Sequence, residues 1–410
     1  MTRPGPLTPS KARSETDFPF LPLLALSGGI FVSMTNEFLP GGLIPLIASD
    51  LKTSVAEVGL LITAFAGVVV ATTIPISWLT RRVSRKPMVV VALAGIGIAA
   101  LLSALAPTFE LLIGTRLFAG LAHGLFWSVA AAYAAHLVPV SQIGRATALT
   151  AGGGALAGIL GVPLGNLLGF AFGWRLAFVS MTALALIVVG VIIWRLPSIA
   201  HRVEVPPGSV ELPRRRDPTL PRVLGICLVL VILISGATSY GTYGVVWLLN
   251  VAHVPEVALP LVLTAGGVVG FIGLAITGRL SDRMPRALLL GALTVVAGAH
   301  LLMPLAAQTP LVLLGLILAT GLTWGSVPTL LQAMNMRTAS PAIRGFAAAA
   351  QTTAINVGIG AGAVLGGLAI GFAGLPSLPA VAGVVIVVAG IVVIIFENAW
   401  RRQPLTSDVN

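Results

Sequence analysis

Charged residues are scarce in this sequence. Its 410 residues include 24 Lys and Arg and 13 Asp and Glu, which together make up 9% of the chain, whereas 57% is hydrophobic. Soluble globular domains carry roughly 25% charged residues. So few charges cannot cover a surface that faces water, and most of the outer surface must meet lipid. The sequence therefore predicts an integral membrane protein.

Cysteine is nearly absent as well, because Cys227 is the single one. One cysteine excludes disulfide bonds within the chain and metal sites built on cysteine clusters. The sequence also lacks clustered His and Asp ligands, a Ser-His-Asp arrangement and paired helical histidines for haem. We therefore expect no metal, no cofactor and no enzymatic activity. Among the functions open to a membrane protein, a membrane-embedded enzyme and a non-transporting sensor are therefore the least favoured.

Long apolar stretches separated by short breaks make up most of the chain. A helix that spans a membrane needs about 20 mostly apolar residues. The predicted helices are 20–47, 54–79, 87–106, 109–136, 142–170, 175–196, 221–250, 257–280, 287–306, 310–335, 343–372 and 378–397. Strands are excluded, because open sheets leave backbone groups unpaired in lipid and barrels need short alternating segments. The expected fold is all-α, with twelve transmembrane helices.

One long polar interruption divides these helices into two sets of six. Residues 197–220 are rich in Pro, Arg and Glu, a composition typical of a solvated linker. The predicted parts of the chain are a tail at 1–19, a six-helix bundle at 20–196, the linker at 197–220, a second six-helix bundle at 221–397 and a tail at 398–410.

Basic residues gather at alternate ends of the predicted helices. If the N-terminus is cytoplasmic, Lys and Arg fall overwhelmingly on the cytoplasmic side, and only Lys52 and Arg175 remain outside. This is the positive-inside distribution of membrane proteins, and it predicts that both termini and the linker are cytoplasmic. It also accounts for the net charge of +11 without a nucleic-acid partner.

The two halves of the chain resemble each other. A basic turn follows the second predicted helix, at 77–86, and another follows the eighth, at 278–286. The start of the fifth helix, at 143–148, is echoed by the start of the eleventh, at 343–348. Parallel repeats related by an axis along the membrane normal are a known plan among transporters. The pattern therefore predicts two pseudo-symmetric bundles.

The second basic turn carries a specific spacing of residues. It reads G-x-L-x-D-R-x-x-R, and the fixed positions are Gly278, Leu280, Asp282, Arg283 and Arg286. This spacing is the signature of the major facilitator superfamily, which the chain resembles over nearly its whole length. The likeness is closest to the drug:proton antiporter branch, which contains sugar-efflux and chloramphenicol-resistance exporters. The segments that carry this likeness are 35–45, 116–127, 161–165 and 356–362.

This resemblance implies a monomeric secondary transporter of a bacterial-type inner membrane that works by alternating access. The branch implies proton-driven export of a small organic molecule, such as chloramphenicol or a sugar, with the proton gradient as driving force. Proton-coupled uptake is the alternative within transport. Because few charges lie within the apolar stretches, a neutral or weakly polar substrate is favoured.

Glu37 is the one acidic residue well inside an apolar stretch. A charge at the bilayer centre costs about 2.5–3.5 kcal/mol on insertion scales. This side chain must therefore face a wet cavity, pair with a base or be protonated. Burial disfavours the ionised form of a carboxyl group, so that such a residue can take up and release a proton. The alternative is a carboxylate fixed in a structural hydrogen-bond network near the outer surface.

Arg116 lies in the outer part of the fourth predicted helix. Arginine stays protonated and cannot itself carry the proton, but it can hold a nearby carboxylate ionised. The resemblance implies a role for Arg116 in proton coupling, and a structural anchor is the alternative. Arg116, His123 and Trp127 are spaced by seven and four residues and so share one helix face. His123 and Trp127 are therefore candidates for the cavity, unless His123 is an ordinary core residue.

Further candidates for the substrate cavity lie on other helices. The seventh helix presents Tyr240, Tyr243 and Trp247 at i, i+3, i+7 spacing. Aromatic side chains with a polar tip suit a site that binds a drug or sugar ring, and an interfacial aromatic belt is the alternative. The polar candidates are Asn36, Gln351 and Asn356.

A cytoplasmic gate is predicted from the repeats. They place Asp282 opposite Arg145, where a salt bridge would favour the outward-open state. The equivalent pair in the other half, Arg81 and Arg344, would repel, because Arg81 stands where the family signature has an Asp. We therefore expect a gate latched on one side only, unless Asp282 is a solvated surface residue.

Glycines crowd the fifth and eleventh predicted helices. A phosphate-binding loop is excluded, because these glycines lie within apolar spans with no following Gly-Lys-Ser/Thr. Small residues let membrane helices approach closely. The family's antiporter motif occupies this part of the fifth helix, and the matching residues are Gly161, Pro163 and Gly165.

Overall fold

The computed structural model describes residues 18–80, 83–139, 142–198, 217–281, 283–340 and 342–402. Within these residues, twelve helical segments are long and apolar enough to cross a membrane, and all the regular elements are helical. The prediction of an all-α membrane protein with twelve spans is confirmed. Most of the predicted linker and most of each predicted tail lie outside the described residues.

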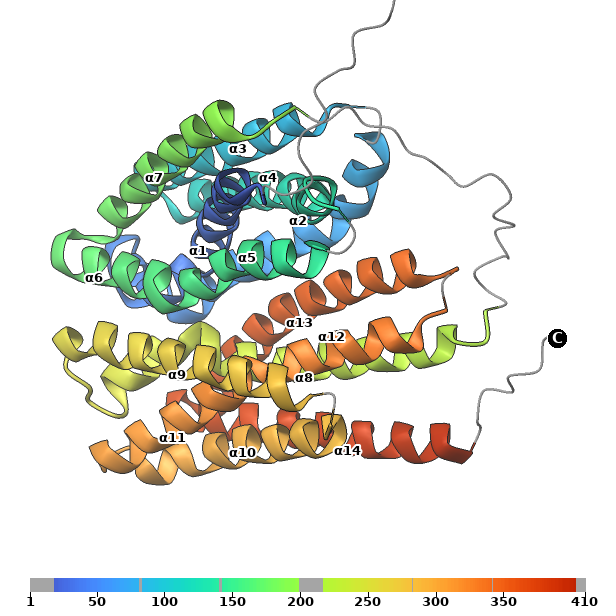
Figure 1. The fold of residues 1–410 in the computed structure, drawn as a ribbon. Helices are drawn as coiled ribbons and strands as arrows, with labels where there is room; N and C mark the ends of the chain where they lie inside the picture. Colours follow the sequence, from blue (N-terminus) through green and yellow to red (C-terminus); the bar gives the residue numbers. More distant parts are fainter. Residues whose placement is uncertain are drawn as a thin grey trace, which may run out of the picture.

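The helices form two bundles, which Figure 1 shows one above the other. The first contains α1 (Phe20–Asp50), α2 (Val55–Leu79), α3 (Arg85–Leu105), α4 (Phe109–His136), α5 (Ile143–Leu156), a π-helical turn (Ala157–Gly161), α6 (Val162–Phe172) and α7 (Trp174–Arg195). The second contains α8 (Leu220–Asn250), α9 (Leu259–Leu280), α10 (Pro285–Ala306), α11 (Pro310–Trp324), α12 (Ser326–Thr338), α13 (Arg344–Ala373) and α14 (Leu378–Arg402). Short 3-10 turns precede α9 and α14, at Glu256–Ala258 and Leu375–Ser377.

Two of the predicted helices are interrupted. The predicted helix at 142–170 consists of α5, the π-helical turn and α6, and the turn ends two residues before Pro163. The predicted helix at 310–335 is divided into α11 and α12 at Gly325, three residues before Pro328. Proline lacks the backbone N–H of a helical hydrogen bond. Each interruption therefore lies where a proline removes one bond of the helix.

In both bundles, glycines allow neighbouring helices to pack closely against each other. In the first, a methyl group at Gly161 would lie 2.1 Å from the hydroxyl oxygen of Thr35 on α1. In the second, a methyl group at Gly362 of α13 would lie 2.5 Å from the carbonyl oxygen of Ser235 on α8. The fifth span thus packs on the first as the eleventh packs on the seventh, which is the arrangement expected of a repeated six-helix unit.

The helix ends of the molecule differ in charge. We call one end the basic end. It holds Arg85, Lys86, Arg145, Arg279, Arg283, Arg286, Arg337 and Arg344. The opposite end holds Asp50 and Arg175, which form an exposed ion pair.

The two bundles meet in their middle turns and toward the opposite end. There Thr63 of α2 donates a hydrogen bond to the carbonyl oxygen of Gly360 on α13, at 3.2 Å. One hydrophobic cluster joins Leu43 of α1 with Tyr243 and Trp247 of α8. Figure 1 shows the same closeness on its left side, where α6 contacts α9. At the basic end, α5 and α12 pack mainly against helices of their own bundles.

Candidate functional site

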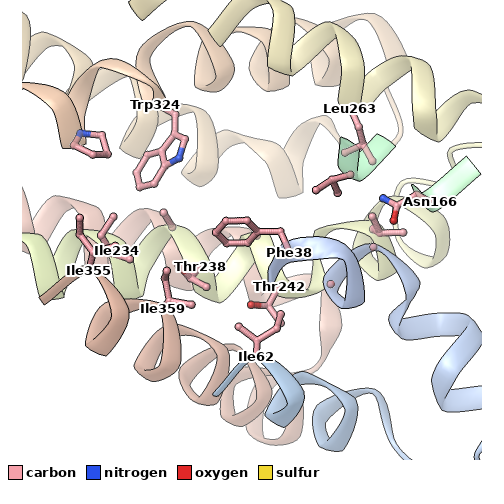
Figure 2. Close-up of a pocket in the computed structure, with 17 residues that line it drawn as sticks. Phe38, Ile62, Asn166, Ile234, Thr238, Thr242, Leu263, Trp324, Ile355 and Ile359 are labelled. Carbon is pink, nitrogen blue, oxygen red and sulfur yellow. The ribbon is translucent and has the colours of Figure 1, made fainter. Parts of the chain in front are cut away.

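A cavity of about 380 Å³ lies between the two bundles (Figure 2). Ligand pockets for small molecules usually measure about 300–1,000 Å³. Its walls come from the middle turns of α1, α2, α8 and α13, from α6 and α9, and from the junction of α11 and α12. None of the described residues that line it carries a charge. The cavity can therefore hold a small uncharged molecule.

Both interrupted helices border this cavity. The π-helical turn leads directly into Val162 and Asn166 of α6, which line one side. The division at Gly325 places Trp324 and Pro328 on another side. Breaks in the regular helix therefore shape the walls at the point where the bundles face each other.

A group of buried polar side chains lies inside the first bundle, beside this cavity. Glu37 of α1 precedes Phe38, which lines the cavity, and only 4% of Glu37 is exposed. One carboxylate oxygen of Glu37 lies 3.7 Å from Nε2 of His123 on α4. The other ring nitrogen of His123, Nδ1, lies 2.9 Å from the hydroxyl oxygen of Ser33. A carboxyl group and an imidazole are thus adjacent in a site shielded from water.

Arg116 is fully buried and is held by the main chain of α1. Its guanidinium group donates hydrogen bonds to the carbonyl oxygens of Asn36, at 3.1 Å, and Glu37, at 3.2 Å. The Asn36 carbonyl is free to accept because its helical partner would be the N–H of Pro40, which proline lacks. The guanidinium carbon also lies 4.6 Å from the centre of the Phe65 ring. Arg116 therefore places a fixed positive charge beside Glu37.

The structure brings together four of the residues predicted in the first bundle. Glu37 and Arg116 are adjacent, and His123 and Trp127 share the expected face of α4, with ring centres 6.0 Å apart. His123 and Trp127 are not among the residues that line the cavity of Figure 2. His123 therefore contacts the carboxyl group of Glu37 rather than that cavity, and Trp127 packs beside His123.

The predicted aromatic residues of the seventh span lie in the packing of α8 against its neighbours. Tyr240 meets Trp247 and His300 edge to face, with ring centres 6.0 and 5.2 Å apart. The hydroxyl of Tyr243 donates a hydrogen bond to the carbonyl oxygen of Ala363 on α13, at 2.9 Å. None of the three predicted aromatics lines the cavity of Figure 2. Their role in binding stays a prediction.

The predicted polar candidates lie in three different places. Gln351 accepts a hydrogen bond from the side chain of Asn335, at 3.0 Å, and so connects α13 with α12. Asn356 lines a separate groove between α2 and α13. Asn36 is buried beside Glu37, and its side-chain amide has no partner within the described part of the chain. Their roles in binding also stay predictions.

The predicted gate falls largely outside the described residues. Asp282 and Arg81 are not described, so the proposed salt bridge to Arg145 stays a prediction. Arg145 itself is exposed, and its guanidinium carbon lies 4.1 Å from the centre of the Phe18 ring.

Most of the residues that line the cavity were not among those predicted from the sequence. Asn166, Thr238 and Thr242 supply polar groups, and Phe38 and Trp324 supply aromatic rings. The signal available was a polar residue within an apolar helix close to a proline, as for Asn166 after Pro163. On α8, Thr238 and Thr242 line the cavity, and their side of the helix is next to the side that carries the predicted aromatic residues.

Comparisons with known proteins agree with this architecture. A family model described as Major Facilitator Superfamily matches residues 26–353 and 228–409. A chloramphenicol efflux pump of Mycobacterium tuberculosis is 34% identical over 373 residues, which cover 88% of this chain and 89% of that protein. A Helicobacter pylori protein named "Probable sugar efflux transporter" is 29% identical over 372 residues, covering 90% of this chain and 94% of the relative.

Solved structures share the fold at low sequence identity. A bacterial homologue of the human lysosomal transporter Spinster, in an inward-facing and occupied conformation, superposes with a TM-score of 0.75 at 16% identity. That match covers 94% of this chain and 98% of the homologue. The inward-facing and unoccupied form gives a TM-score of 0.76 at 15% identity, covering 97% of this chain and all of the other.

Proposed function

The chain belongs to the Major Facilitator Superfamily, and from that membership we propose that it exports small organic molecules in exchange for protons, by alternating access. The names of the relatives, a chloramphenicol efflux pump and a probable sugar efflux transporter, support export over uptake. Protons drive the cycle, and a small uncharged molecule occupies the cavity between the bundles.

One observation carries this proposal: a buried carboxyl group lies beside the cavity with a base and a fixed positive charge around it. Glu37 can be neutral or ionised, and the imidazole of His123 lies 3.7 Å from one of its carboxylate oxygens. Arg116 balances the ionised carboxylate and leaves a net positive charge when Glu37 is protonated. An intramembrane ionisable residue with such partners is typical of proton relays.

Helix α1 connects the proton site with the cavity. Glu37 is followed on the same helix by Phe38, Gly41 and Gly42, which line the cavity. A change in the charge of Glu37 alters the attraction between α1 and Arg116 on α4, because the two groups are close and shielded from water. Protonation therefore biases the position of α1, and with it the wall of the cavity.

We assign the basic end to the cytoplasm, because cytoplasmic loops of membrane proteins carry the excess of Lys and Arg. The bundles are in contact toward the opposite end, where α2 meets α13 and α6 meets α9. In this orientation the structure is the inward-facing state, which takes up a substrate from the cytoplasm. The protein then lies in a bacterial-type inner membrane, with both termini inside.

The test is a growth panel of toxic compounds and sugars in cells that express the wild type or Glu37→Gln. The wild type is expected to protect cells from at least one compound, and Glu37→Gln is expected to abolish that protection. Glu110→Gln, the same change at an exposed position of α4, is the matched control. Equal protection by wild type and Glu37→Gln would contradict the proton role. Greater accumulation of the compound in wild-type cells than in cells without the protein would indicate uptake.

A further inference from the structure

Asn166 is a buried polar side chain with no hydrogen-bond partner among the described residues. Only 1% of it is exposed, and neither its amide nitrogen nor its carbonyl oxygen has a partner among the residues that the structure describes. Its side chain lines the cavity between the bundles (Figure 2). Buried polar groups in proteins are nearly always paired. The amide nitrogen and oxygen of Asn166 are therefore available to hydrogen-bond a molecule inside the cavity.

The position of this amide depends on a glycine of α1. A methyl group at Gly42 would lie 2.1 Å from the amide nitrogen and oxygen of Asn166. Any larger residue at position 42 would therefore displace the side chain. The sequence leaves room at this point of α1 for a polar group that no described residue binds.

Thr242, on the other bundle, also lines the cavity with a polar side chain. Its side chain is 2% exposed and lines the same cavity, and its hydroxyl has no partner within the described ranges. Its backbone carbonyl oxygen would lie 3.6 Å from a methyl group at Gly41. Since Gly41 and Gly42 are consecutive, Asn166 and Thr242 approach the same turn of α1. Each bundle thus supplies one polar group without a described partner to the cavity wall, with Thr242 nearer the middle of the cavity than Asn166 in Figure 2.

The part of the cavity away from Asn166 is largely apolar and aromatic. Figure 2 shows Trp324, Ile234 and Ile355 there, together with the hydroxyl-bearing Thr238, and Phe38 lies between this group and Asn166. The flat faces of Trp324 and Phe38 suit an aromatic ring. An organic cation would find no counter-charge among the described lining residues, and an unmodified sugar would leave most of its hydroxyl groups unpaired.

From this polarity we infer that the substrate is an uncharged, ring-bearing molecule whose amide or hydroxyl groups hydrogen-bond Asn166 of one bundle and Thr242 of the other. The inference rests on the proposed function and names the substrate class of the same cavity. Because the two residues belong to different bundles, they hold the substrate jointly only while the bundles are closed at this end. Separation of the bundles there parts the two contacts and releases the molecule.

The test is binding of labelled chloramphenicol, a ring with an amide and hydroxyl groups, to the full-length protein in lipid nanodiscs. Asn166→Leu and Thr242→Val keep similar volumes and remove the hydrogen bonds. Each is expected to weaken binding about tenfold, as loss of one hydrogen bond does. Thr294→Val, on an exposed turn of α10, should leave binding unchanged. The melting temperatures of Asn166→Leu and Thr242→Val should not fall, because neither side-chain polar group has a described internal partner.

Wild-type binding to both variants would overturn the inference, and so would a fall in melting temperature that parallels the loss of binding. Absence of binding by the wild type, or stronger displacement of the label by a free sugar or an organic cation, would overturn it as well. All of these results leave export itself intact. Failure of the proposed function appears separately, as a growth panel in which the wild type protects cells from no compound.

Discussion

Arg116 illustrates how one residue can organise a buried site without pairing directly with an acid. Its two hydrogen bonds go to the carbonyl oxygens of Asn36 and Glu37, and Pro40 explains why the first is available. The planar guanidinium group suits two acceptors at once, whereas the ammonium group of lysine is a compact point charge. Geometry as well as charge therefore fixes α1 to α4.

Arg116→Lys is expected to lower the free energy of unfolding by roughly 1–3 kcal/mol, because one buried carbonyl oxygen loses its donor. Thermal unfolding of the purified protein in detergent measures this change. Arg145→Lys, at an exposed arginine stacked on Phe18, is the control and should leave stability nearly unchanged. Equal melting temperatures for Arg116→Lys and the wild type would show that charge alone matters at this position.

At the scale of the elements, Asp217 connects the start of α8 with the segment between α12 and α13. Its carboxylate accepts hydrogen bonds from the backbone and hydroxyl of Thr219, at 2.8 and 2.6 Å, and from the hydroxyl of Ser340. Burial alone would raise the pKa of Asp217, but these hydrogen bonds outweigh it and hold the pKa below its usual value of 3.8. The ionised form is thus the one that stabilises this contact.

A carboxyl group with a lowered pKa contributes stability above its unfolded pKa and loses that contribution as pH falls through the folded value. Asp217→Asn is therefore expected to lower the melting temperature at pH 7. The difference between the two proteins should begin to shrink as the pH falls below about 4, the pKa of an unfolded aspartate, and should disappear once the pH is below the lowered pKa of the folded carboxyl group. Melting curves at pH 7 and across this acidic range measure it. A difference that persists unchanged at low pH would show that the contact does not depend on ionisation.

The elements also show what the sequence could and could not predict. Length and apolar composition determine the spans, because lipid admits only helices with internally paired backbones. The divisions at Gly325 and before Pro163 were not predicted, since membrane helices tolerate proline when neighbours or local turns re-satisfy the freed groups. The side of α8 that lines the cavity was not predicted, because the sides of this helix that face lipid, the protein core and the cavity are all largely apolar. Thr242 and Tyr243 are neighbours in sequence, and only the contact between the bundles distinguishes their roles.

At the scale of the whole molecule, the two bundles are closed toward the end opposite the basic residues. There Ala56 of α2 and Gly367 of α13 approach so closely that a methyl group at Gly367 would lie 3.6 Å from the Cβ of Ala56. Disulfide bonds join residues whose Cβ atoms are about 3.5–4.5 Å apart. This distance offers a direct way to lock the observed state.

Ala56→Cys with Gly367→Cys, in a Cys227→Ser background, is expected to form a disulfide bond under oxidising conditions and to stop export. Alternating access requires this end to open in every cycle, so a reducing agent should restore transport. Each single cysteine variant serves as the control for the effect of substitution. Undiminished export by the crosslinked protein would show that this contact need not open, and the assignment of the closed end would then be wrong.

The proposed transport cycle depends most on the carboxyl group of Glu37 as the proton carrier. The most direct measurement is accumulation of labelled substrate in proteoliposomes under an imposed pH gradient, together with exchange of the same label without a gradient. We predict that Glu37→Gln loses gradient-driven accumulation but still exchanges label, because the cavity is intact and only coupling is lost. Accumulation by Glu37→Gln at the wild-type level would contradict the role of Glu37 as the proton carrier.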